Sequence, residues 1–214
     1  MPVDARPSAP RAVLRARHRA RTGRRRARPP RGQRSSLSPG GDVPPGAAFR
    51  ICLVCLGNIC RSPMAATVLR QRLREAGLAH RVVVESAGTG GWHLGGPADP
   101  RALAALGAHG YQADEHSARQ FGVDSFADYD RVLAMDRDNL ADLGLLAPDA
   151  VSREAVQMLR AYDPAALAAG DLDVQDPYYG SDDGFDRVLE QVEPAVDGLV
   201  EALRRELSEE PRVD

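Results

Sequence analysis

The chain has 214 residues, 43% of them hydrophobic and 27% charged, which is enough for one sizeable domain with a buried core. Its net charge of −2 hides an uneven distribution, because residues 1–49 hold twelve arginines against Asp4 and Asp42 and so carry +10, while residues 50–214 carry −12. The tail has no apolar core of signal-peptide length, no later segment is apolar enough to span a membrane, and all three cysteines fall within nine residues. We therefore expect a cytoplasmic protein without membrane contact or a disulfide framework.

Residues 1–49 are rich in Arg, Pro, Gly and Ser and lack apolar periodicity, so we expect them to be disordered. A basic arm that contacts nucleic acid or another acidic surface is one interpretation. A transit peptide fits less well, because the segment has little amphipathic apolar content. We favour an over-extended start of the coding sequence. The expected organisation is this tail, a folded domain over 50–208 and a C-terminal tail over 209–214.

The first predicted element is a short buried strand over Ile51–Val54, since the run is apolar and β-branched. Ser62 is a good N-cap and Pro63 suits a first helical position, which predicts a helix from Pro63 to Ala76. Further along the chain, the patterns predict strands at 82–84, 131–135 and 156–159, and helices at 100–108, 137–143 and 185–207, with a helical turn at 125–128.

The alternation of buried strands with helices predicts an α/β fold of three layers: a four-stranded parallel sheet with helices on both faces. Pro194 and Gly198 lie inside the last helix, where we expect a kink or a break. Ligands of such sheets bind beyond the carboxyl ends of the strands. Cys55 falls at that place, directly after the first strand.

The loop after the first strand, VCLGNICRSP over residues 54–63, predicts a site for covalent phosphoryl transfer. The backbone N–H groups of residues 56–61 can form an anion-binding concavity at the positive end of a helix dipole. A Cys55 thiol held there loses its proton easily, because the same donors stabilise the thiolate. Arg61 can present its guanidinium to two oxygens of a phosphate.

A thiolate that attacks phosphorus also needs an acid to protonate the leaving oxygen. The acidic loop from Asp163 to Asp183 offers five candidates, and composition leaves the choice among them open: Asp171, Asp173, Asp176, Asp182 and Asp183. The distinctive stretch is Asp176-Pro-Tyr-Tyr-Gly, because Tyr178 and Tyr179 could line a pocket for another aromatic ring.

Three motifs together, CLGNICRSPMA from Cys55, SAGT from Ser86 and DPYY from Asp176, resemble the low-molecular-weight protein tyrosine phosphatase family over about residues 50–207. The resemblance implies hydrolysis of phosphotyrosine and small aryl phosphates, with Cys55 as the nucleophile that becomes phosphocysteine. It implies that Arg61 clamps the phosphoryl oxygens and that Asp176 is the general acid. The implied substrate-binding set is Leu56, Gly57, Asn58, Ile59, Cys60, Ser62, Trp92, Tyr178 and Tyr179.

The same resemblance assigns supporting roles around the loop. Ser62 supports the thiolate, and Asn58 holds a strained turn through a network that reaches Ser86 and His116. Cys60 matches the second loop cysteine, which forms a reversible disulfide with Cys55 and shields it from over-oxidation. Trp92 borders the active-site mouth. For His93 we expect an ordinary surface position, and for Asp136 a structural role.

Other functions remain to be weighed. Arsenate reduction on the same scaffold needs relay cysteines, and no cysteine follows Cys60. Protein-arginine phosphatases resemble this loop but have Thr where Ile59 stands. A non-enzymatic alternative is a binder of nucleic acid, through the tail, or of phosphoproteins. We expect no cofactor and no metal, phosphotyrosine-containing proteins as partners, and a monomer; the five histidines show no ligand spacing with Cys or carboxylates.

Overall fold

The computed structural model describes residues 49–208; the tails predicted at 1–49 and 209–214 lie outside that range except for Phe49. Four parallel strands form one sheet in the order β2-β1-β3-β4 within these residues, as the sequence predicts. Their bounds are β1 (Phe49–Cys55), β2 (Val82–Gly88), β3 (Arg131–Ala134) and β4 (Val156–Met158). No helix of the described part is long and apolar enough to cross a membrane.

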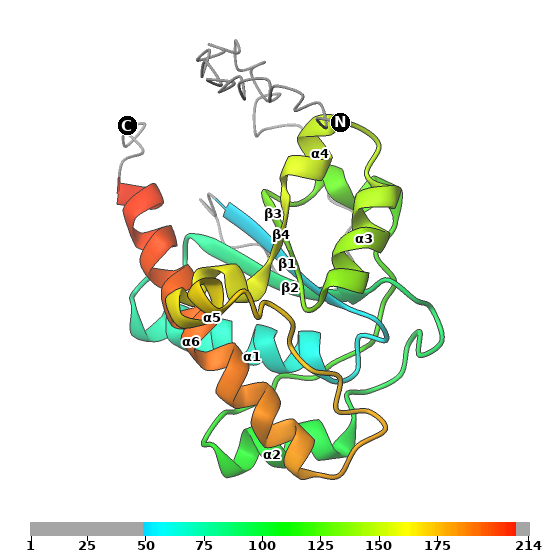
Figure 1. Ribbon diagram of the computed structural model, residues 1–214. Coiled ribbons are helices and arrows are strands. Elements are labelled where there is room, and N and C mark those ends of the chain that lie inside the picture. Colours follow the sequence, from blue (N-terminus) through cyan, green and yellow to red (C-terminus); the bar gives the residue numbers. More distant parts are fainter. Residues whose placement is uncertain (1–48, 209–214) are drawn as a thin grey trace, which may run out of the picture. The chain divides into compact units, whose positions relative to one another are not determined.

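Helices cover both faces of the sheet (Figure 1). Ile51 and Leu53 of β1 point into a core shared with α1 (Arg61–Glu75), α2 (Pro100–Ala108) and α6 (Asp183–Ser208). Cys52 and Val54 alternate to the opposite face, where they pack in a second core with Leu143 of α3 (Arg137–Leu146). The predicted three-layer α/β architecture is therefore confirmed.

Four short helical elements lie mostly in stretches where apolar periodicity gives little signal. They are the turn η2 (Val123–Ala127), α4 (Ala150–Glu154), the turn η3 (Leu159–Tyr162) and α5 (Pro164–Ala169). The prediction of an acidic loop from Asp163 onward is wrong in its first part, because Asp163 accepts a hydrogen bond from the Ala165 N–H and caps α5. β4 ends one residue earlier than predicted, since Leu159 already begins η3.

Ser62 is not the N-cap of α1, contrary to the prediction. The helix begins at Arg61 and its N-cap is Cys60, which makes no side-chain cap hydrogen bond. The Ser62 hydroxyl instead lies 3.1 Å from the Cys55 sulfur. This hydroxyl thus contacts the thiol at the end of β1 from a position inside the first turn of α1.

Of the kink or break predicted for the last helix, the break does not occur, since α6 runs unbroken from Asp183 to Ser208 through Pro194. Pro194 lies on the exposed side of the helix, where its ring does not interrupt the buried stripe. Gly198 has a different role: a Cβ there would stand 1.9 Å from the carbonyl oxygen of Tyr162. The glycine lets α6 approach the backbone of η3, and the buried apolar stripe of the helix compensates for both poor helix formers.

Candidate active site

The carboxyl ends of three strands deliver the main groups of the site to one edge of the sheet. β1 ends at Cys55, β2 ends at Gly88, and Asp136 follows β3. Gly88 has to be a glycine, because a Cβ there would lie 2.6 Å from the Leu56 carbonyl oxygen. The Gly90 N–H in turn donates to that oxygen at 2.9 Å, so the segment after β2 holds the loop after β1.

Asn58 fixes the shape of the loop between β1 and α1. Its φ of 56° is the only positive value at a non-glycine residue in the described chain, and asparagine tolerates this conformation better than most residues. The Asn58 side-chain amide donates to Ser62 Oγ at 2.9 Å and to Ser86 Oγ at 3.0 Å. Its side-chain oxygen accepts the Arg119 backbone N–H at 2.9 Å, so all of these bonds restrain one strained turn.

His116 completes this network from the other side of the loop. Its Nε2 donates to the Asn58 carbonyl oxygen at 2.6 Å. Burial lowers the pKa of His116, with the Arg70 and Arg119 charges acting in the same direction. The contacts predicted for Asn58 with Ser86 and His116 are therefore present, while the donated N–H from Arg119 comes from a residue that the sequence pattern left without a role.

The Cys55 thiol faces hydrogen-bond donors inside this frame. Its sulfur accepts the Asn58 backbone N–H at 3.3 Å and lies 3.1 Å from Ser62 Oγ. The Ser62 hydroxyl also lies 3.3 Å from the Ala87 carbonyl oxygen, so its single proton can turn to either acceptor. A thiolate is the stronger acceptor of the two, because hydrogen bonds to charged groups are stronger than those to neutral ones.

Arg61 is buried beside the thiol, at the first position of α1. It donates to the Asp136 carboxylate at 2.5 Å, to the Val174 carbonyl oxygen at 3.1 Å and to the Asp176 carboxylate. Burial acts against its charge, but the nearby Cys55 and Asp176 together with Asp136 raise the pKa of its guanidinium above the ordinary value. Arg61 is therefore a permanent cation at the base of the loop.

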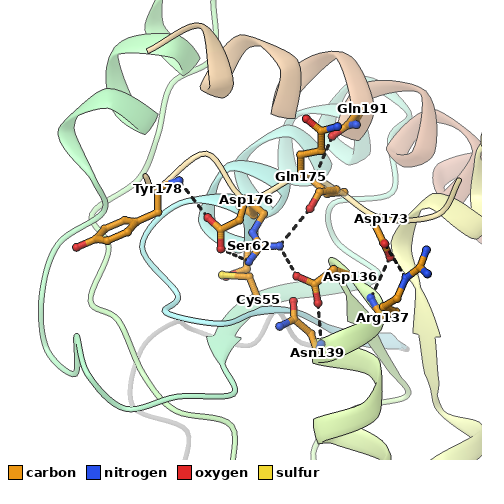
Figure 2. Close-up of polar contacts among 12 residues, drawn as sticks. Cys55, Ser62, Asp136, Arg137, Asn139, Asp173, Gln175, Asp176, Tyr178 and Gln191 are labelled. Carbon is orange, nitrogen blue, oxygen red and sulfur yellow. Dashed lines mark hydrogen bonds and ion pairs between the residues drawn. The ribbon is translucent and has the colours of Figure 1, made fainter. Parts of the chain in front are cut away.

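Asp136 matches the structural role expected for it. One of its oxygens accepts the Asn139 N–H at 2.7 Å and so caps α3 (Figure 2). The other oxygen pairs with Arg61. Its carboxylate therefore orients the guanidinium of Arg61 from the side of α3.

Asp176 is the one acidic residue of the late loop that lines the pocket above Cys55. Asp173 binds the backbone N–H of Arg137 at 3.0 Å and its guanidinium at 2.8 Å, and Gln175 binds Gln191 of α6 (Figure 2). Asp171 pairs with Arg160 instead. The structure thus separates the five candidates that composition leaves open: the others anchor the loop or lie exposed, and the Asp176 carboxylate faces the pocket.

The pocket has a volume of about 370 Å³, and eleven residues line it. They are Cys55, Leu56, Gly57, Ile59, Cys60, Arg61, Trp92, His93, Asp176, Tyr178 and Tyr179. Of the predicted substrate-binding set, only Asn58 and Ser62 are missing from this lining, because both are fully buried beneath the loop.

The rim of the pocket is aromatic. Trp92 is 75% exposed and Tyr179 97%, while the Tyr178 ring packs edge-on against Tyr179 with 4.9 Å between the ring centroids. His93 is not an ordinary surface residue, contrary to the prediction: it is half-buried, lines the pocket and lies 6.0 Å from the Tyr178 ring. A Cβ at Gly57 would stand 3.0 Å from the His93 ring, so a larger residue there would require that ring to shift.

Cys60 lies in the same loop but faces a carboxylate. Its sulfur donates to Asp99 Oδ2 at 3.8 Å. Burial, with the charge of Asp99, raises the pKa of Cys60 to about 12. Burial also raises the pKa of Cys52, in the middle of β1, to about 12. All three cysteines are free thiols.

No group of His, Cys, Asp and Glu in the part of the chain that the structure describes is arranged to hold a metal ion. The site brings together a thiol, a buried guanidinium, a carboxyl group and a concave loop at a helix N-terminus. Together these groups define a cysteine-based phosphoryl-transfer site.

Comparison with known proteins identifies the family. The model of the low molecular weight phosphotyrosine protein phosphatases matches residues 50–209, and the chain belongs to this family. It is 54% identical over 159 residues to a Streptomyces coelicolor low molecular weight protein-tyrosine-phosphatase, covering 74% of this chain and 96% of the relative. It is 46% identical over 151 residues to low molecular weight protein-tyrosine phosphatase A of Mycobacterium tuberculosis, covering 71% and 89%.

A solved structure agrees with this assignment. The protein tyrosine phosphatase from Entamoeba histolytica, crystallised with Hepes in its active site, superposes with a TM-score of 0.70 at 31% identity. The match covers 75% of this chain and 99% of the Entamoeba chain. Nothing in the comparisons supports the protein-arginine phosphatase or the arsenate reductase alternative.

Proposed function

We propose that the chain is a cysteine-dependent protein-tyrosine phosphatase that hydrolyses phosphotyrosine and small aryl phosphates through a phosphocysteine on Cys55. The observation that carries the proposal is the position of the Cys55 sulfur, 3.1 Å from Ser62 Oγ and 3.3 Å from the Asn58 nitrogen, in a pocket that Arg61 and Asp176 also line. Phosphotyrosine-containing proteins are the substrates that the family assignment supports.

In the first step the Cys55 thiolate attacks phosphorus and the bond from phosphorus to the phenolic oxygen breaks. The loop N–H groups and the Arg61 guanidinium stabilise the charge on the phosphoryl oxygens. Asp176 gives its proton to the leaving oxygen, so that a neutral phenol departs. No oxidation or reduction takes place, because a P–S bond simply replaces a P–O bond.

In the second step a water molecule attacks the phosphocysteine. Asp176, now a carboxylate, takes a proton from this water, and the Cys55 thiolate leaves as the P–S bond breaks. The Ser62 hydroxyl donates to the departing sulfur and stabilises its negative charge. Inorganic phosphate is released and both groups regain their starting protonation.

Substrate binding has to exchange one contact of Arg61. In the structure the guanidinium binds the Asp176 carboxylate on one side and the Asp136 carboxylate on the other. A phosphoryl group that occupies the loop competes with Asp176 for Arg61, while Asp136 retains it. The exchange frees Asp176 to receive a proton and to face the leaving group.

Aromatic substrates fit the walls of the pocket. Trp92, Tyr178 and Tyr179 offer ring faces and edges above the loop, and aromatic pairs gain about 0.5–1.5 kcal/mol beyond the burial of their area. Ile59 adds an apolar side chain beside the thiol. These residues favour a phenolic phosphate over a phosphate on an aliphatic chain.

We also propose the cytoplasm as the compartment and a monomer as the working form. The three free thiols are consistent with a reducing compartment.

Cys60 protects Cys55 from over-oxidation in this proposal. Peroxide oxidises the Cys55 thiolate to a sulfenic acid, and the Cys60 thiol then displaces water from it to form a disulfide. Inactivation by peroxide should then be reversible by dithiothreitol, and less so in Cys60→Ser.

Leaving-group dependence tests the roles of Cys55 and Asp176. Cys55→Ser should abolish turnover of every aryl phosphate, whereas Asp176→Ala should slow phenyl phosphate by about 10²–10⁴-fold and p-nitrophenyl phosphate far less. Asp171→Ala is the matched control, because it removes a carboxylate of the same loop that does not line the pocket. Equal losses in Asp176→Ala across leaving groups would remove Asp176 from the acid role.

A further inference from the structure

We propose that Asp99 and Arg101 form a positioning bridge that holds the Asp176 loop over the Cys55 loop, an inference that rests on the proposed phosphatase function. Neither residue lines the pocket. Both lie at the start of α2, between the two loops that the reaction needs, and each makes contacts in both directions.

Arg101 holds the loop that carries Asp176. Its Nη2 donates to the Tyr178 carbonyl oxygen at 3.1 Å, and Nη1 lies 3.5 Å from the Gly180 carbonyl oxygen. Its guanidinium also stacks 4.8 Å above the Phe185 ring, near the start of α6. One side chain therefore joins the stretch after Asp176 to the first turn of the helix that follows.

Asp99 holds Arg101 in this orientation. Its Oδ1 accepts from the Arg101 Nε at 3.1 Å, and its Oδ2 accepts from Nη2 at 2.9 Å. The same Oδ1 accepts the Arg101 backbone N–H at 2.8 Å and so caps α2. Because the guanidinium is planar, this bidentate pairing fixes the directions of its remaining N–H groups.

Asp99 also binds the loop of the nucleophile. Its backbone N–H donates to the Ile59 carbonyl oxygen at 2.8 Å, and its Oδ2 accepts the Cys60 thiol at 3.8 Å. Asp99 is therefore in direct contact with residues four and five positions after Cys55. The chain of contacts runs from the Cys55 loop through Asp99 and Arg101 to Tyr178, two residues beyond Asp176.

The other hydrogen bonds that attach the acid loop to the rest of the protein stop short of Tyr178, although the His93 ring lies 6.0 Å from the Tyr178 ring. Val174 donates to the Met135 carbonyl oxygen at 2.7 Å and Gln175 binds Gln191, both before Asp176. Beyond it, the hydrogen bonds from the Tyr178 N–H to Asp176 and from the Gly180 N–H to Pro177 are internal to the loop. In the described chain Arg101 is thus the side chain from outside the loop that hydrogen-bonds Tyr178–Gly180.

The bridge matters because the reaction requires an accurate position of the Asp176 carboxyl group. A general acid has to lie within hydrogen-bond reach of the leaving oxygen, and a displacement of about 1 Å can cost roughly a hundredfold in rate. Without the bridge, the stretch Tyr178–Gly180 loses its hydrogen bonds to a side chain outside the loop. The bridge should therefore matter most where protonation of the leaving group limits the rate.

Two variants of the full chain test the bridge. Arg101→Lys keeps the charge but cannot bind Asp99 and the loop carbonyls together, and Asp99→Asn keeps the cap of α2 but loses its charge. Each should lower kcat/KM for phenyl phosphate by roughly 10- to 100-fold and for p-nitrophenyl phosphate by about twofold or less. Arg204→Ala, which removes an exposed arginine paired with Glu201 on α6, is the control and should match the wild type.

A double-variant cycle shows whether the bridge acts through Asp176. In the Asp176→Ala background, Arg101→Lys should cost less than about twofold on phenyl phosphate, because the acid that it positions is gone. Thermal unfolding of each variant separates a loss of folded protein from a loss of positioning.

The outcomes of the proposal and of the function are distinguishable. The bridge alone would be overturned if Cys55→Ser abolished turnover but Arg101→Lys and Asp99→Asn kept the same kcat/KM as Arg204→Ala. An equal loss on both substrates, or the same loss with and without Asp176, would also overturn it. A wild-type protein that hydrolyses neither aryl phosphate would overturn the proposed function instead.

Discussion

At the scale of single residues, the two loop cysteines differ in their neighbours. The Cys55 sulfur accepts from the Asn58 N–H, whereas the Cys60 thiol donates to the Asp99 carboxylate. The Asp99 carboxylate opposes a negative charge on Cys60, whereas the Cys55 sulfur has a backbone hydrogen-bond donor beside it. Residues five positions apart thus have opposite neighbours in one loop.

Asp99→Asn should therefore activate Cys60. Burial, with the Asp99 charge, raises the pKa of Cys60 to about 12, and removing that charge lowers the pKa. A decrease of one unit raises the thiolate fraction at a fixed alkaline pH about tenfold. The measurement is the rate of iodoacetamide labelling at Cys60, followed by mass spectrometry in a Cys55→Ser background.

Cys52 is the internal reference for that experiment. Burial also raises the pKa of Cys52 to about 12, but the charges near it belong to Arg119 and Glu85 rather than to Asp99. Its labelling should stay slow and unchanged in Asp99→Asn. A ratio of Cys60 to Cys52 labelling that does not increase would contradict this account of the Cys60 thiol.

At the scale of elements, glycines in two helices should respond oppositely to the same change. A Cβ at Gly198 of α6 would meet the Tyr162 carbonyl oxygen at 1.9 Å, while a Cβ at Gly144 of α3 would meet nothing within 4 Å. Gly144→Ala should stabilise the protein by up to about 1 kcal/mol, because alanine is the better helix former. Gly198→Ala should instead destabilise it, since α6 has to move away from η3.

Chemical denaturation of the two variants measures both effects on the free energy of unfolding. A stabilising Gly198→Ala would show that α6 does not require the close approach to η3. A Gly144→Ala variant less stable than the wild type would show that α3 has less room than the structure gives it.

The elements also show how far the sequence could predict the fold. The apolar stripe of α6 is long enough to be recognised through Pro194 and Gly198, but its continuity depends on burial against α1 and η3, which periodicity does not encode. α4 and α5 are five and six residues long, too short for a periodic signal. Ser62 has the features of an N-cap, but the tertiary fold gives its hydroxyl other partners in Cys55, Asn58 and Ala87.

In the site, too, the sequence could predict what lies in a contiguous motif but not what depends on contacts between distant segments. Cys55, Arg61 and Asp176 belong to contiguous motifs, so the sequence could predict their presence in one pocket. Composition could not choose Asp176 among its neighbours, since the choice depends on which carboxylates Arg137 and Arg160 bind elsewhere. No sequence motif predicted the positions of His93 and Arg101, because these positions result from contacts between distant segments.

At the scale of the whole molecule, the half-buried His116 links three segments to the stability of the fold. It bonds the Asn58 carbonyl oxygen, and Asn58 in turn bonds Ser86 of β2 and the backbone of Arg119. Burial lowers the pKa of His116 below its value in an unfolded chain. The unfolded state therefore binds more protons near pH 6, and stability falls as the pH falls through that range.

Melting temperatures between pH 7.5 and 5 should therefore decrease with acidification. The contribution of one such histidine is at most about 1.4 kcal/mol per pH unit. His116→Gln keeps a donor for the Asn58 carbonyl without titrating, so its curve should be flatter over the same range. A wild-type and a variant curve that run parallel would contradict the role of His116 in this dependence.

The central claim is that the phosphoryl group passes through the sulfur of Cys55. Rapid acid quench of the wild-type protein during turnover of p-nitrophenyl phosphate, followed by peptide mass spectrometry, tests it most directly. The account predicts a phosphoryl group on Cys55 within the first turnover, and neither label nor turnover in Cys55→Ser. A phosphoryl group on another residue, or hydrolysis that persists in Cys55→Ser, would contradict it.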